Sequence, residues 1–124
     1  MSCYVDQAAF PFGRMIMCHL WADSLEELLA MVDRIGVERK WIQGHPTLSQ
    51  PRFRRASWVH FDIAKCKRAA AIEAGALETD RYGAAYFDAQ QRGRPAMVKR
   101  IEAKRRAAGQ PADGIVRAAQ GALI

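Results

Sequence analysis

The segment from Ser24 to Gly36 carries the signal that most limits how this chain can fold. Ser24 and Glu27 form a capping box, in which each side chain binds the backbone amide of the other residue at a helix start. Apolar residues then recur at helical spacing along one stripe, and Gly36 suits the left-handed position that ends a helix. The stripe consists of Leu25, Leu28, Leu29, Val32 and Ile35. The pattern predicts an amphipathic helix whose apolar face must be covered by the rest of the chain.

An apolar run at residues 15–22, interrupted only by His19, comes directly before this helix. Its length suits a strand that is covered on both faces, so we expect it at the centre of a sheet. Further segments are typical of strands and helices, and Asp62 is expected to cap the helix that follows it. The strands are 3–6, 57–61 and 76–79, and the helices are 63–74, 81–91 and 96–108. This order predicts an α/β fold: a small three- or four-stranded, mainly parallel sheet with packed helices and a basic C-terminal helical extension.

A chain of 124 residues fits one domain. We expect residues 1–108 to form this globular domain, and 109–124 to be an alanine-rich tail that adds at most a marginal helix. No apolar run reaches the roughly 20 residues that span a bilayer, and the N-terminus lacks a secretory signal. The three cysteines lack paired short spacing, which suits reduced thiols. The expectation is a cytoplasmic protein without membrane contact, cofactor or dedicated metal motif.

The net charge of +6 is concentrated in two basic blocks. Residues 38–68 hold eight cations against two carboxylates, and residues 92–106 hold seven cations against Glu102 alone. Such blocks attract polyanions, although a basic solvated surface that serves only solubility is the alternative interpretation. The charge pattern predicts nucleic acid or a phosphorylated small molecule as a partner, and it does not indicate an oligomeric state.

Polar side chains follow or interrupt the predicted strands. His19, His60 and Asp62 are the candidate catalytic residues, and Asp6 is placed to join them. If the strands that end near these residues are parallel neighbours, their carboxyl ends share one sheet edge. The side chains could then form a cluster for metal binding or general acid-base work. The alternative is structural: a satisfied core histidine, a strand-face histidine and a helix cap.

Candidate anion-binding residues are the cations near the start of the predicted helix 63–74, together with two cations that follow the first helix. They are Lys65, Lys67, Arg68, Arg39 and Lys40. Free amides and the helix dipole favour an anion at a helix start, whereas cations there oppose the dipole. We expect Lys67 and Arg68 to bind an anion next to His60, with solvated surface cations as the alternative.

Several short segments resemble an uncharacterised bacterial and phage family, domain of unknown function 4031. The matching residues include 4–6, 13–23, 34–41, 60–63, 67–69 and 75–76. The resemblance covers about residues 3–80 in the same order, and residues 81–124 look like an appended extension. Phe61 stands where tyrosine is common in the family, and Ala64 and Cys66 stand where hydroxyl residues are common. The resemblance implies membership, without an activity, substrate or cofactor.

Two classes of function fit these observations. The leading hypothesis is a small basic module that binds nucleic acid or a phosphorylated ligand. The alternative is a small hydrolase or nuclease-like enzyme that uses the His and Asp site, with or without a metal. Convergence of His19, His60 and Asp62 in space is the observation that separates them.

Overall fold

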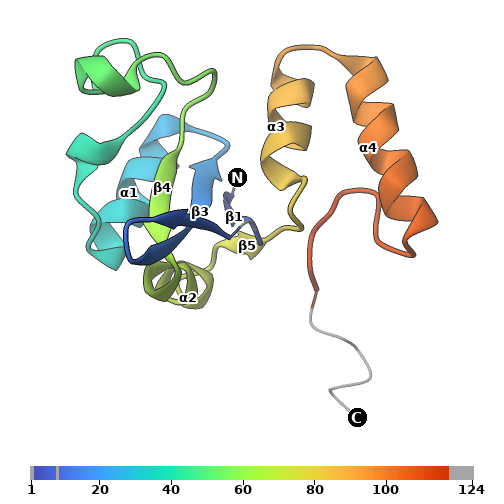
Figure 1. The fold of residues 1–124 in the computed structure, drawn as a ribbon, viewed down its shortest axis with the longest axis horizontal. Coiled ribbons are helices and arrows are strands. Elements are labelled where there is room, and N and C mark those ends of the chain that lie inside the picture. The colour runs from blue at the N-terminus through green and yellow to red at the C-terminus, as the bar shows by residue number, and fades with distance from the viewer. Residues whose placement is uncertain (1, 8, 118–124) are drawn as a thin grey trace.

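The computed structural model describes residues 2–7 and 9–117 (Figure 1). Its elements are β1 (Cys3–Val5), β2 (Phe10–Phe12), β3 (Met15–Ala22), α1 (Leu25–Ile35), β4 (Phe61–Ala64), α2 (Lys65–Glu73), β5 (Leu77–Glu78), α3 (Gly83–Gln91) and α4 (Pro95–Ala107). Two short 3-10 helices, Arg39–Trp41 and Pro51–Phe53, lie in the long connection between α1 and β4. None of the helices in the described residues is long and apolar enough to cross a bilayer.

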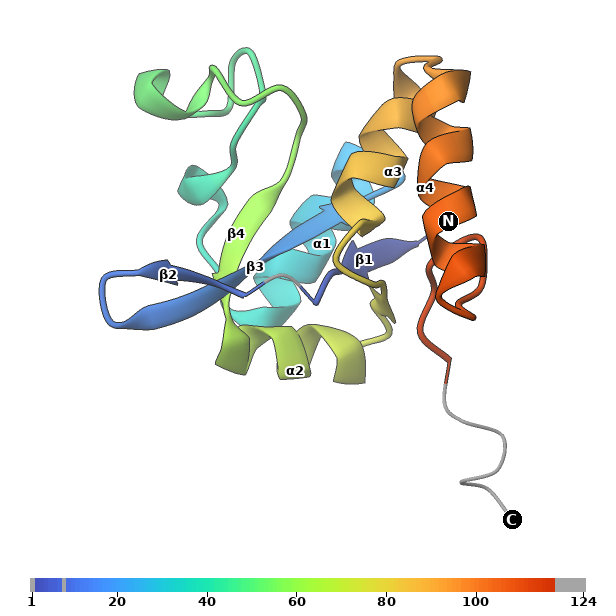
Figure 2. The ribbon, with the colours of Figure 1, turned by 45° about the vertical axis from the view of Figure 1, so that its right-hand side comes forward.

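The sheet is mixed and has five strands, more than the three or four that the sequence predicted. β3 pairs antiparallel with β1, β2 and β4, and only β1 and β5 are parallel. The α/β class and the central place of β3 are therefore confirmed, but the prediction of a mainly parallel sheet is wrong. The cause is the tight turn at Gly13 (φ 60), which folds β2 back onto the start of β3 and leaves the end of β3 for β1. In Figure 2 this hairpin extends beyond the rest of the sheet.

Helices α1 and α2 cover one face of the sheet. Alternate residues of β3 and β4 point to them, including the buried side chains of Leu20, Phe61 and Ile63. The capping box is confirmed, because the Glu27 amide donates to Ser24 Oγ at 3.2 Å. α3 lies on the opposite face of the sheet from α1 (Figure 2), where the Phe87 ring packs 6.3 Å from that of Trp21. The sheet thus has one face sealed by α1 and α2 and one face that α3 covers in part.

The apolar stripe of α1 allows a paired stability prediction. Leu28 is 1% exposed, whereas Leu29 is only partly buried at the edge of the core. We expect Leu28→Ala to lower the free energy of unfolding by about 2 kcal/mol, because the side chain also borders a pocket into which the cavity can open. Leu29→Ala is expected to lower the free energy of unfolding by less than about 1 kcal/mol, because water can fill the space that the side chain leaves and no buried cavity forms. Urea denaturation of both variants measures the difference, and equal losses would contradict this packing.

The junction between β4 and α2 differs from the prediction. The strand expected at 57–61 lies at 61–64, and α2 begins at Lys65 with Ala64 at its N-cap and no side-chain cap. Asp62 is therefore a strand residue, directly opposite His19 in the β3–β4 register, and the prediction that it caps the helix is wrong. The ladder with β3 runs on to Ala64, so the carboxylate of Asp62 faces the sheet surface instead of a helix end.

The basic C-terminal part packs more closely than a solvated extension. α4 lies beside α3, and its Ile101 and Arg105 are buried (Figure 1). Residues 109–117 form turns and a bridge between Ile115 and Thr79 rather than a helix. The Val116 amide also donates to the Glu78 carbonyl at 2.7 Å. The remainder of the expected tail, 118–124, lies outside the described residues.

Three free cysteines occupy two kinds of environment. Cys3 and Cys18 are buried, and Cys66 is exposed. Burial, with smaller effects of Glu27 and Asp23, raises the pKa of Cys3 to about 11. Burial, with a smaller effect of Asp6, raises the pKa of Cys18 to about 12.

One thiol in the folded protein should therefore react with Ellman's reagent near neutral pH, because the thiolate is the reactive form and only Cys66 is accessible. All three thiols should react once denaturant has unfolded the protein. Cys66→Ser is expected to abolish the native reaction. A rapid native reaction of this variant would show that Cys3 or Cys18 is reached by solvent.

Candidate metal centre

Three polar side chains meet on the sheet face opposite α1 and α2. His19 lies in the middle of β3, Asp62 lies opposite it on β4, and His60 lies just before β4. Their neighbours Cys18 and Phe61 point into the core, so the alternation of a strand directs the three to the other face. The three candidate residues of the sequence analysis do converge, but an antiparallel pair of strands brings them together, and not a shared edge of parallel strands.

The separations suit ligands of one ion. Asp62 Oδ1 lies 3.3 Å from His60 Nε2 and 3.9 Å from His19 Nε2. All three ligand atoms lie within 4.8 Å of one another. Two ligands at about 2.0–2.2 Å from a tetrahedral zinc ion lie about 3.4 Å apart. The observed geometry needs only small side-chain adjustments to reach that arrangement.

His19 is held by a buried carboxylate. Asp6 directly follows β1 and is fully buried. Its Oδ2 atom lies 2.7 Å from Nδ1 of His19. Its Oδ1 accepts the backbone amide of His19 at 3.0 Å. A carboxylate only accepts, so Nδ1 carries the hydrogen and the neutral ring presents its Nε2 lone pair toward Asp62. Burial lowers the pKa of His19, but the hydrogen bond and charge of Asp6, with the charge of Asp62, outweigh burial and raise it.

His60 is oriented by its own loop. Its Nδ1 lies 3.0 Å from the Trp58 carbonyl oxygen, which can only accept, so this nitrogen also carries the hydrogen. The Trp58 ring stacks on the imidazole at 4.1 Å between centroids and an angle of 10°. The other ring nitrogen, Nε2, lies 3.3 Å from the same oxygen of Asp62 and can donate a proton to it or share a cation with it.

Asp62 completes the cluster with an oxygen that lacks a hydrogen-bond partner. Oδ2 accepts from Gln43 Nε2 at 2.7 Å, whereas the buried Oδ1 has no partner among the described residues. Burial raises the pKa of Asp62, but neighbouring His60 and Gln43, with the charge of His19, outweigh burial and lower it. An ionised Oδ1 thus faces the Nε2 atoms of two imidazoles, and this arrangement needs either a proton on Nε2 or a cation between the atoms.

Solvent reaches the cluster from one side. The side chains of His19 and Asp62 are 28% and 27% exposed, and that of His60 is 6% exposed. Phe10 on β2 and Trp58 flank the His19 ring at centroid distances of 5.0 and 5.7 Å. The exposed part of the His19 and Asp62 side chains thus borders the solvent, whereas Asp62 Oδ1 itself is buried and aromatic rings flank His19.

The predicted anion-binding cations are already engaged within the protein. Lys67 Nζ donates to the Ile35 carbonyl at the end of α1, at 2.9 Å. Arg68 Nε donates to the Asp6 carbonyl at 2.8 Å, and its guanidinium pairs with Glu78. None of the contacts among the described residues joins Lys67 or Arg68 to His60.

The other cations of that set lie elsewhere. Arg39 pairs with Asp33 at 2.6 Å and Lys40 with Glu38 at 3.1 Å, all four being exposed. Lys65 lines a pocket on the α2 side together with Arg68. Anion binding by these residues stays a prediction, and within the described part of the chain they are linked to the histidine cluster only through the contact of Arg68 with Asp6.

Two contributors to the site were not identified from the sequence. Gln43 comes from the long connection, and its backbone exchanges hydrogen bonds with that of His60 at 2.9 and 3.1 Å. No local pattern marks this pairing, because the partners are far apart in the chain. Trp58 precedes His60 by two residues, and this spacing, which places two side chains on one face of an extended segment, is a signal that could have found it.

Fold and cluster together define a small mixed α/β domain with a solvent-accessible His–His–Asp site. A family model described as protein of unknown function (DUF4031) matches residues 3–91. The chain belongs to this family, and the match extends from β1 to the end of α3, beyond the expected limit near residue 80. All the cluster residues lie within it, whereas α4 lies outside. No curated protein and no solved structure matches the chain significantly.

Proposed function

We propose that the protein is a metal-dependent hydrolase of phosphate esters, with His19, His60 and Asp62 as the metal ligands. One observation carries the proposal: one ligand atom each of His19, His60 and Asp62 lies within 4.8 Å of the others, and the buried Oδ1 of Asp62 lacks a hydrogen bond. Without a cation or a proton this arrangement is repulsive, and folding would not favour it unless something positive occupied it.

The chemistry of the donor set supports a first-row divalent ion such as Zn²⁺. Two imidazole nitrogens and one carboxylate oxygen are borderline ligands that this ion accepts readily. Asp6 stands behind His19 as the carboxylate that fixes the ring and increases its basicity. Gln43 fixes the second oxygen of Asp62 in the same way. The site therefore has both its ligands and the residues that orient them.

Three protein ligands leave an open position on a four-coordinate ion, which is the arrangement of catalytic rather than structural zinc sites. A bound ion would supply Lewis acidity and a lowered pKa for a water molecule beside it. The open position lies toward the solvent-accessible side chains of His19 and Asp62. His60, almost fully buried under Trp58, serves to anchor the ion.

The charge of the protein supports a phosphate-containing substrate. Its net charge is +6, and the exposed residues of α4 include Lys99, Arg100, Lys104 and Arg106. A positive protein concentrates anionic substrates by long-range attraction. The substrate class is therefore a nucleic acid or a phosphorylated small molecule, the partner that the charge pattern of the sequence predicts.

Hydrolysis of bis(p-nitrophenyl) phosphate and p-nitrophenyl phosphate, with the protein stripped by a chelator and then given Zn²⁺, Mn²⁺ or Mg²⁺, tests the proposal. We expect activity only after metal addition, and its loss in His60→Ala but not in Gln90→Ala, at an exposed residue of α3 outside this site. Metal binding without hydrolysis of either ester would overturn the hydrolase while leaving the metal centre. Activity that persists in the chelator would instead assign the cluster to acid-base catalysis without metal.

A further inference from the structure

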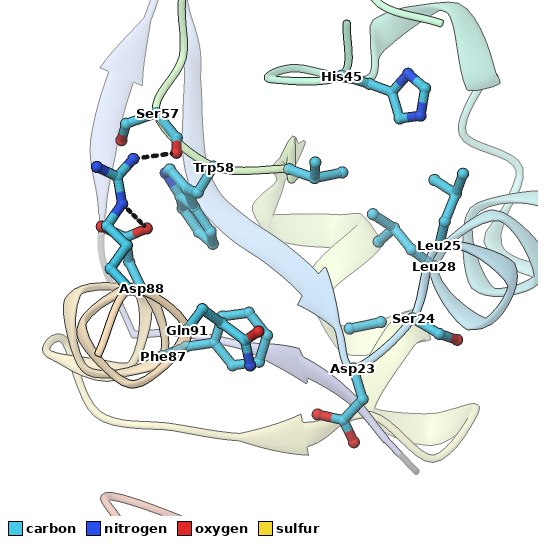
Figure 3. Close-up of a pocket in the computed structure, with 13 residues that line it drawn as sticks. Asp23, Ser24, Leu25, Leu28, His45, Ser57, Trp58, Phe87, Asp88 and Gln91 are labelled. Atoms are coloured by element: carbon cyan, nitrogen blue, oxygen red, sulfur yellow. Dashed lines mark hydrogen bonds and ion pairs between the residues drawn. The ribbon is translucent and has the colours of Figure 1, made fainter. Parts of the chain in front are cut away.

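We infer that the pocket beside the cluster binds a planar heteroaromatic ring, the base of a nucleotide-like substrate whose phosphate would lie at the metal. The inference rests on the proposed function for the place of the phosphate, but ring binding itself needs no metal. The pocket has a volume of ≈ 390 Å³ and lies between the start of α1, the segment before β4 and α3 (Figure 3). This volume falls within the range of about 300–1,000 Å³ that small-molecule sites occupy.

The walls of the pocket are apolar and partly aromatic. Leu25 and Leu28 line it from α1, Phe87 from α3, and Trp58 and Val59 from the segment before β4 (Figure 3). Aromatic side chains offer flat surfaces on which bases of any sequence stack. The shape and chemistry of these walls favour a flat ring.

Trp58 connects the pocket with the cluster. Its side chain lines the pocket, and its ring lies 4.1 Å from the His60 ring and 5.7 Å from the His19 ring. A molecule that contacts Trp58 in the pocket is therefore one side chain away from the ligands of the proposed metal. A base and the phosphate attached to it through a sugar span such a separation.

The charged groups of the pocket argue against an anion inside it. Arg92 is its one cation among the described residues, and it pairs with Asp88 at 2.9 Å and also donates to the Ser57 carbonyl. Asp23 accepts from the Tyr4 hydroxyl at 3.0 Å and remains a second carboxylate at the rim. A phosphate would thus meet one neutralised cation and two carboxylates, which leaves the uncharged base as the part that fits.

Two polar groups in the pocket suit the edge of a heteroaromatic ring. His45 Nδ1 accepts the Leu48 amide at 2.9 Å, so the neutral imidazole carries its hydrogen on Nε2 as a donor. The exposed carboxamide of Gln91 makes no hydrogen bond with the other described residues and can both donate and accept. A benzene-like ring would leave these groups unused.

Titration of the metal-free protein with adenosine, cytidine and ribose 5-phosphate tests this inference by NMR of the tryptophan indole NH signals. The protein has three tryptophans, so the Trp58 signal can be assigned with Trp58→Phe. We expect nucleosides to shift the Trp58 signal at millimolar concentration, and ribose 5-phosphate to leave it unchanged. Phe87→Leu, which removes an aromatic wall of the pocket, should weaken nucleoside binding about tenfold, the loss of one stacking surface.

A matched pair on α3 provides the control. Gln91→Ala should weaken nucleoside binding, whereas Gln90→Ala, at an exposed neighbour that lines a different pocket, should not. No shift with any nucleoside, or equal shifts with ribose 5-phosphate, would overturn the inference. Because the titration contains no metal, its failure is independent of a failure of the hydrolase assay.

Discussion

Replacement of His60 by alanine is expected to weaken Zn²⁺ binding on the order of 1,000-fold, because one of the three proposed ligands is lost. Calorimetric titration of the chelator-treated protein with Zn²⁺ measures the effect. Asp6→Asn should weaken binding about 10- to 100-fold, since it removes only the group that orients His19. The larger loss of Zn²⁺ affinity in His60→Ala than in Asp6→Asn distinguishes a metal ligand from a residue that only orients a ligand.

The third histidine is the control for this experiment. His45 lies outside the cluster, and its Nδ1 is occupied by the Leu48 amide. His45→Ala should therefore bind Zn²⁺ as tightly as the wild type. A thermal melt with and without Zn²⁺ gives a second readout, because an ion that binds only the folded state raises its stability. Equal weakening by His45→Ala and His60→Ala would place the ion elsewhere.

Arg105→Met is expected to lower the free energy of unfolding by about 3 to 5 kcal/mol, the usual cost of breaking a buried ion pair from one side. The Arg105 side chain is fully buried and holds both oxygens of Asp80, at 2.8 and 2.9 Å. It also donates to the Ala112 carbonyl at 2.6 Å and lies 4.3 Å from the Tyr86 ring centre. Loss of the guanidinium releases the chain after α4 and leaves Asp80 without its cation.

Urea denaturation measures this loss, and the adjacent residue provides the control. Arg106 is exposed, so Arg106→Met should change stability by less than about 0.5 kcal/mol. The double variant Asp80→Leu with Arg105→Met should be more stable than Arg105→Met alone, because no charge is then left without its partner. A loss below 1 kcal/mol for Arg105→Met would show that the contact adds little to folding.

Helices and strands that are specified by neighbouring residues could be predicted from the sequence. Ser24 marks the start of α1 and Gly36 its end, through hydrogen bonds and dihedral angles that involve near neighbours only. The apolar run of β3 likewise marks a central strand, because both of its faces lack polar residues except at His19. The candidates His19, His60 and Asp62 were visible as polar residues in apolar surroundings.

How these parts meet could not be predicted, because it depends on contacts between distant segments of the chain. Strand direction depends on pairing between segments far apart in the chain, and the β3–β4 register set Asp62 opposite His19 instead of at a helix start. Arg105 looked like one more solvated cation of a basic helix, because its partner Asp80 lies 25 residues away. Ion pairs and strand ladders at such separations leave no periodic trace in a single sequence, since the energy that selects them arises from burial in the assembled fold.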